Sequence, residues 1–171
     1  MMNKLKTVLY SAPWSARFGI VVILIFSVIS IFAPLIAPYG ETEIIGKSYE
    51  LWSEKHILGT DNLGRDMLSR LIFGARNTIG MALLTTFLAF LIGSITGMIA
   101  AVLGGWVDQI FGRIVDVLMS IPSLIFALLI LSFFGTSVTY LIGTIAILEA
   151  TRVFRLARAT GMNVAVMDLL K

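Results

Sequence analysis

The sequence contains no cysteine, a single histidine and few charged residues. Charged residues make up 13% of the 171 positions and hydrophobic residues 58%, whereas a soluble domain carries about 25% charged residues. The lack of cysteine excludes disulfides and thiolate metal sites. With one histidine and no paired carboxylates in one motif, no catalytic, cofactor-binding or metal-binding residues are predicted, and the chain is not expected to be an enzyme.

The scarcity of charge leaves four long apolar windows, each near the roughly 20 residues that a membrane-spanning helix needs. They cover about residues 18–37, 78–103, 114–134 and 138–156. The sequence therefore predicts an all-α membrane protein with about four transmembrane helices. The first window is longer than the roughly 7–15 apolar residues of a signal peptide, so we expect an uncleaved anchor.

The distribution of Lys and Arg predicts the orientation, because these residues favour the cytoplasmic side. The tail of residues 1–17 carries Lys4, Lys6 and Arg17. A second basic group lies at the end of the fourth window and beyond it: Arg152, Arg155, Arg158 and Lys171. Both ends are therefore expected in the cytoplasm. Residues 38–76 are then an external loop, although this loop also contains basic residues.

The stretch HILGTDNLGRDMLSRLIFGAR, residues 56–76, closes that loop. Asp61 is a candidate helix cap, and the residues after it show amphipathic spacing, which predicts an interfacial helix leading into the second span. The apolar face comprises Met67, Leu68, Leu71, Ile72 and Ala75, and the polar face Arg65, Asp66, Ser69, Arg70 and Arg76. A phosphate loop would need a Lys after its glycine, and His56 has no second metal ligand at suitable spacing.

Small residues recur at every fourth position of the second span. The series is Thr85, Ala89, Gly93, Gly97, Ala101 and Gly105. Positions i and i+4 share a helix face, and GxxxG spacing lets two helix backbones approach closely. We predict helix packing through Ala89, Gly93, Gly97 and Ala101, against the alternative that small residues are merely common in membrane helices.

Polar residues in the third and fourth windows offer two interpretations each. Pro122 is expected to bend the third helix, either as a structural kink or as a hinge along a pathway. Glu149 is costly inside a membrane, so it faces a water-filled path, pairs with Arg152 or lies at the interface. Arg113 and Asp116, three residues apart, are close enough to pair.

Three segments resemble the inner-membrane permease subunits of ABC importers, in particular the C-type subunit of the dipeptide, oligopeptide and nickel branch. They are residues 56–76, GGWVDQIFGRIVDVLMSIPSLIFALLI and TRVFRLARA. The resemblance implies a six-helix type-1 permease fold, of which residues 77–171 are the start of the transmembrane domain. It also implies an EAA loop and two further helices beyond Lys171, so the chain is expected to be the first part of a longer permease, without ATP-coupled uptake of its own.

The resemblance further implies the partners and the location. They are a second permease subunit, cytoplasmic ATPase subunits, a periplasmic substrate-binding protein and the bilayer of a bacterial inner membrane, with no nucleic acid and no cofactor. Di- or oligopeptides are favoured as cargo over nickel chelates. The alternative is a small four-helix membrane protein that acts alone, as a channel or an assembly factor.

Overall fold

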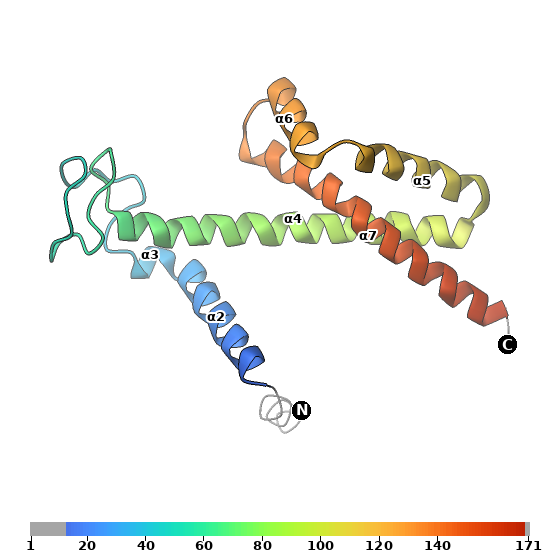
Figure 1. Cartoon of the computed structure of the whole chain (residues 1–171), viewed down its shortest axis with the longest axis horizontal. Helices are drawn as coiled ribbons and strands as arrows, with labels where there is room; N and C mark the ends of the chain where they lie inside the picture. The colour runs from blue at the N-terminus through green and yellow to red at the C-terminus, as the bar shows by residue number, and fades with distance from the viewer. Residues whose placement is uncertain (1–12, 170–171) are drawn as a thin grey trace. The chain divides into compact units, whose positions relative to one another are not determined.

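The computed structural model describes residues 13–169, and all regular secondary structure in this range is helical. Two isolated bridges, Ile44–Arg65 and Thr60–Asp66, are the only β-type pairings among these residues. The predicted all-α class is confirmed. The chain divides at Gly80 into two compact units, and Figure 1 shows the order of their helices.

The first unit begins with two consecutive helices, α2 (Trp14–Ile31) and α3 (Ala33–Ile36). Pro34 has no N–H to donate to the carbonyl of Ser30, so α2 cannot continue and the chain turns at Phe32. Nearly all apolar side chains of α2 are exposed, as expected for a helix whose surroundings are lipid rather than protein.

An irregular segment of about thirty residues follows and leads into α4 (Met67–Leu103). The predicted interfacial helix and second span are thus one continuous helix of 37 residues, with no break near residue 78. The first part of α4 belongs to the first unit and the part after Gly80 to the second.

The second unit continues with α5 (Gly105–Ser120). Gly104 and Gly105 have φ values of 58° and 54°, a region that side chains other than glycine seldom adopt. The two glycines let the chain reverse between α4 and α5. Gly105 therefore lies beyond the end of α4 and is not part of the small-residue face predicted for that helix.

The predicted third window falls on two helices, α5 and α6 (Ser123–Phe134), which meet at a bend of 92°. Gly135, with φ of 93°, ends α6. The last helix, α7 (Val138–Leu169), is 32 residues long and continues well past residue 156, where the predicted fourth span ends. It packs on both α5 and α6.

Two helices within residues 13–169 are long and apolar enough to cross a membrane. They are α2 and α4, with mean hydropathies of 2.1 and 2.2, and the bent pair α5–α6 becomes a third candidate if it is one broken span. Helix α7 is not among these candidates, so a fourth span at 138–156 stays a prediction.

Candidate functional sites: a helix-packing seam, inter-helix ion pairs and an ordered loop

Helices α4 and α7 touch backbone to backbone at Gly93 and Gly97. A Cβ atom added to Gly93 would lie 2.6 Å from the carbonyl oxygen of Ala150 and 2.6 Å from Cβ of Val153. At Gly97 the corresponding distances are 2.7 Å to the carbonyl oxygen of Phe154 and 2.9 Å to Cβ of Ala157. Neither position has room for any side chain.

This contact line, the α4–α7 seam, extends one turn further at each end. Ala89 is buried, and a Cβ atom added to Gly161 would lie 2.7 Å from Cβ of Ala101. The structure therefore places Gly93, Gly97 and Ala101 against α7, a partner that i, i+4 spacing alone does not identify. Because the glycines have no side chains, the two backbones approach closely and gain dispersion contacts. In a membrane such close packing favours association of the helices over contact with lipid.

A small hydrophobic core and a cavity lie beside the seam. Ala100, Val115 and Phe154 form the core, with the ring of Phe111 6.3 Å from that of Phe154. The cavity, of about 160 Å³, is lined almost entirely by apolar atoms of α4, α5 and α7. Such a lining has no charged group to bind a polar substrate.

Two ion pairs join α5 to α7. Arg158 donates from Nε and Nη2 to both carboxylate oxygens of Asp108, a bidentate arrangement that fixes orientation as well as distance. Arg155 donates from Nη2 to Asp116 at 2.7 Å. The predicted partner of Asp116 was Arg113, and this is wrong: α7 supplies the Arg instead, because packing brings it to the face of α5 that carries Asp116.

Asp108 was not among the residues predicted from the sequence. Its one local signal is its position in the first turn of α5, where an acidic residue is favoured by the helix dipole. Its partner Arg158 is 50 residues away, so only tertiary structure identifies the pair.

Glu149 is in an ion pair with a neighbour on its own helix, and Pro122 lies at a bend between two helices. Glu149 accepts a hydrogen bond from Nη1 of Arg152 at 3.0 Å, one of the alternatives given for it above. The Arg152 side chain is largely exposed and the Glu149 side chain is about half exposed. Pro122 lies at the N-terminal end of α6, next to the 92° bend, in extended backbone. The bend arises because Pro122 restricts Ile121 to extended backbone and itself has no N–H to donate.

In the first unit, a network around Asp61 holds the irregular segment together. Its carboxylate accepts hydrogen bonds from the backbone of Leu63 (2.8 Å) and Arg65 (3.0 Å) and from the Arg65 and Arg70 side chains. Burial by itself raises the pKa of Asp61, but the hydrogen bonds from Arg65 and Leu63 outweigh it and lower the pKa to about 2. Asp61 therefore forms a turn before α4 and does not cap it.

Asp66 is the residue that caps α4. Its Oδ2 accepts from the backbone N–H of Ser69 at 2.7 Å and from the Ser69 hydroxyl at 2.8 Å, which is the usual geometry of an N-cap. Both side chains are buried, but Arg70 and Arg76 of the predicted polar face are exposed, as is Leu71 of the predicted apolar face. The predicted division of these residues into a polar and an apolar face therefore does not match their burial.

His56 lies beside this cap, with Nδ1 3.6 Å from Asp66 Oδ1 and no hydrogen-bond partner for that nitrogen. Among the residues whose placement is described, no three His, Cys, Asp or Glu side chains converge to hold a metal ion. The ordered features described above are contacts between helices and within a loop.

Two protein families match this chain in separate segments. The N-terminal TM domain of oligopeptide transport permease C matches residues 14–50, and the binding-protein-dependent transport system inner membrane component matches residues 89–171. Together the two matches cover most of the chain, and the second contains the α4–α7 seam and both α5–α7 ion pairs.

Individual relatives agree with the family matches. The dipeptide transport system permease protein DppC of Haemophilus influenzae is 34% identical over 86% of this chain and 52% of its own length. The probable D,D-dipeptide transport system permease protein DdpC of Escherichia coli K12 is 33% identical over 94% of this chain and 54% of its own length. The peptide transport system permease protein SapC of Escherichia coli O6:H1 is 37% identical over 67% of this chain and 41% of its own length.

The chain spans about half the length of these relatives. The match over residues 89–171 contains two of the three segments that carried the resemblance, 104–130 and 151–159, whereas the segment 56–76 lies between the two matches. The chain belongs to the family of inner-membrane permease components of binding-protein-dependent transport systems and is similar to the C-type subunits of its peptide branch.

Proposed function

We propose that this chain is a permease subunit that forms part of the translocation pathway of an ATP-driven importer, with di- or oligopeptides as cargo. The observation that carries the proposal is the match of two separate segments, 14–50 and 89–171, to permease families. The names of the relatives, which refer to dipeptide and peptide transport, support the choice of cargo.

The proposed role is that of a non-enzymatic scaffold. Within the second unit, the α4–α7 seam and the Asp108–Arg158 pair hold α4, α5 and α7 together. Helices that are fixed to one another in this way move as a body, which is what a gated pathway needs from its walls. Pro122, at the α5–α6 bend, is the proposed hinge residue, and Glu149, half-exposed on α7, is the proposed pathway residue.

Such a subunit works with partners. We infer a second permease subunit beside it, ATPase subunits on the cytoplasmic face and a soluble binding protein on the outer face, in a bacterial inner membrane. The proposed orientation places the N-terminus in the cytoplasm, because the basic residues Lys4, Lys6 and Arg17 precede the first span and such residues favour the cytoplasmic side. The segment between α2 and α4 then lies outside the cell membrane.

Co-purification with a second permease subunit tests this proposal. The tagged chain is expressed with an epitope-tagged second permease subunit from the same organism, and the complex is isolated from detergent-solubilised membranes. We expect both subunits to be recovered together, and Gly93→Leu to reduce recovery at least fivefold because it disrupts the α4–α7 seam.

The matched control is Gly80→Leu in the same helix, where an added Cβ atom meets nothing within 4 Å. This variant is expected to co-purify as the unsubstituted chain does. Recovery of the chain alone, at normal expression and with the second subunit present in the same membranes, would contradict the proposed function.

A further inference from the structure

His56 is buried in the first unit, where three parts of the chain meet. Only 6% of this residue is exposed. Its ring lies against that of Tyr39, which follows α3, with the ring centroids 5.7 Å apart. Its Nδ1 lies 3.6 Å from Oδ1 of Asp66, the residue that caps α4. His56 therefore connects the irregular segment to the chain on either side of it.

One nitrogen of this buried ring has no partner. Asp66 makes both bonds of the cap through Oδ2, and the Ser69 hydroxyl that donates to it also accepts from the backbone N–H of Tyr39 at 3.1 Å. Nδ1 of His56, by contrast, makes no hydrogen bond with any of the described residues. Buried polar atoms are almost always hydrogen-bonded, so this exception needs a physical explanation.

Two carboxylates lie against the imidazole, one beside each nitrogen. Asp66 faces Nδ1, and Oε2 of Glu50 lies 4.0 Å from Nε2. The Asp66 side chain is 2% exposed and the Glu50 side chain 38% exposed, so Asp66 is the stronger partner because water screens its charge less. Tyr39, the third titratable neighbour, donates its hydroxyl to the carbonyl of Lys55 at 3.3 Å.

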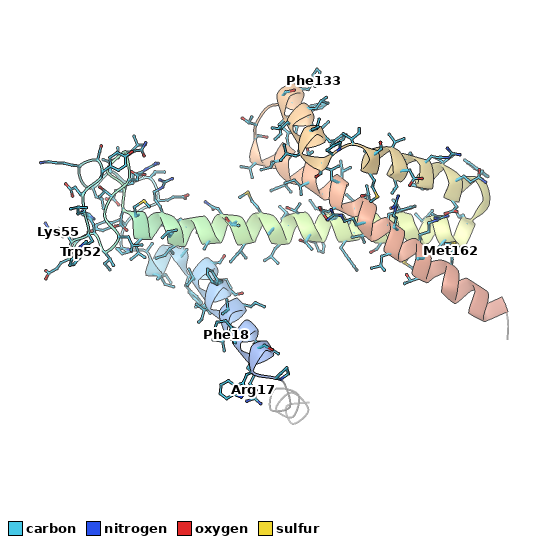
Figure 2. The ribbon with its side chains drawn as sticks, viewed as in Figure 1. Arg17, Phe18, Trp52, Lys55, Phe133 and Met162 are labelled. Carbon is cyan, nitrogen blue, oxygen red and sulfur yellow. The ribbon has the colours of Figure 1, made fainter. Side chains whose placement is uncertain are left out.

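Three basic residues of the same segment lie away from these carboxylates. Arg65 and Arg70 both pair with Asp61. Lys55, the neighbour of His56 in sequence, is exposed and lies at the outer edge of the segment in Figure 2. These three side chains therefore leave the two carboxylates free to pair with His56.

We propose that His56 is a pH-sensitive switch, which fastens the segment between α2 and α4 to the start of α4 when it is protonated. Histidine changes its charge between about pH 5 and 8. The charged ring is a donor at both nitrogens, whereas the neutral ring has one donor and can pair with only one of the two carboxylates. Charge-assisted N–H···O bonds are about 2.8 Å long, so a movement of about 1 Å turns the contact with Asp66 into such a bond.

Two opposing effects determine the sign of the response. Burial disfavours a charged imidazole, whereas adjacent carboxylates favour it. Here there are two carboxylates, and a protonated His56 neutralises the buried charge of Asp66 within the segment. An unfolded segment has no such partners, so protonation stabilises the folded segment as the pH falls through the histidine range, and this stabilisation is lost as the pH rises. The switch couples the order of the segment to the pH of the compartment that it faces.

The test uses the fact that the chain has a single histidine. The full chain, purified through a tag without histidine, is labelled with 15N-histidine and placed in lipid nanodiscs. We expect the imidazole NMR signals to show protonation of both nitrogens as the pH is lowered from about 8 to about 5. Amide exchange of residues 53–60, corrected for intrinsic rates and followed by mass spectrometry, should slow at least about threefold over the same interval.

Three variants identify the groups responsible. His56→Gln should remove the response of amide exchange to pH. Asp66→Asn should remove most of it, because Asn is also a good helix cap but has no charge to pair with the imidazolium. The matched control is Glu54→Gln, which removes an exposed carboxylate two positions from His56 and should keep the full response.

Three results would overturn the inference. The first is an imidazole that stays neutral down to about pH 5. The second is a charged imidazole with unchanged or faster amide exchange, because protonation would then not stabilise the segment. The third is an equal response in Asp66→Asn and Glu54→Gln, because the effect would then not depend on the carboxylate beside Nδ1.

Discussion

Replacing Gly93 with Ala is the smallest change that probes the α4–α7 seam. The added Cβ atom would lie 2.6 Å from the carbonyl oxygen of Ala150 and 2.9 Å from the backbone N of Phe154. Ordinary contacts between such atoms are about 3.5 Å, so the two helices must separate by about 1 Å. Because these are backbone atoms, trimming the side chain of Val153 cannot relieve the clash.

The size of the effect follows from two opposing terms. Overpacking costs about 1–3 kcal/mol, whereas alanine is favoured over glycine in a helix by about 1 kcal/mol. Gly80→Ala in the same helix meets nothing within 4 Å and reports the second term alone. The difference between the two variants therefore isolates the packing cost, and we expect Gly93→Ala to be less stable than Gly80→Ala by about 1–3 kcal/mol.

The assay is reversible unfolding of the purified chain in mixed micelles by titration with SDS, followed by tryptophan fluorescence. Gly97→Ala should behave like Gly93→Ala, since its added Cβ atom would lie 2.7 Å from the carbonyl oxygen of Phe154. Equal stability of Gly93→Ala and Gly80→Ala would refute the reasoning, because it would mean that α4 and α7 do not touch at this position.

Three further predictions concern the charged residues. Asp108→Asn should lower the free energy of unfolding by about 1–3 kcal/mol, because the bidentate pair of Asp108 with Arg158 is half-buried. Asp116→Asn, at an exposed pair, should lower it by less than about 1 kcal/mol. Equal losses for the two variants in SDS titration would contradict this. Asp66→Ala removes the cap of α4 and should lower the free energy of unfolding by about 1–2 kcal/mol. Limited proteolysis of the segment before α4 should then be faster, and an unchanged rate would contradict the role of Asp66 as the cap. The pKa of Asp61 is lowered from 3.8 to about 2, so the stabilisation by its carboxylate is present above pH 4 and is lost as the pH falls toward 2. Amide exchange of residues 60–66, corrected for intrinsic rates, should therefore rise between pH 4 and pH 2 in the unsubstituted chain. The same rise should not occur in Asp61→Asn.

The sequence predicted the features that depend on neighbours along one helix. The spacing of Ala89, Gly93 and Gly97 identifies a face on which backbones can approach, because residues four apart always share a face. The all-helical class and the first two spans likewise follow from long apolar windows. These signals are local, and no knowledge of the partner helix is required to read them.

The features that the sequence did not predict depend on distant contacts or on competition between similar residues. Asp61 and Asp66 are equally good caps by type, and Asp61 is engaged by Leu63 and Arg65 in a turn, so Asp66 takes the cap. Asp116 has an Arg three residues away, but α7 presents another at better geometry. The large bend beside Pro122 was expected only as a kink within one helix.

Disulfide crosslinking in isolated membranes tests whether α4, α5 and α7 form one scaffold closed by the α4–α7 seam. The chain has no cysteine of its own, so Ala101→Cys with Gly161→Cys introduces one pair. The Cβ atoms at these positions would lie 2.7 Å apart, so a local shift of about 1 Å brings them to the spacing of about 3.8 Å that a disulfide needs. We expect rapid intramolecular crosslinking of this pair, and little for Gly112→Cys with Gly161→Cys, since an added Cβ atom at Gly112 meets nothing within 4 Å. Equal crosslinking of both pairs, or none of the first, would contradict it.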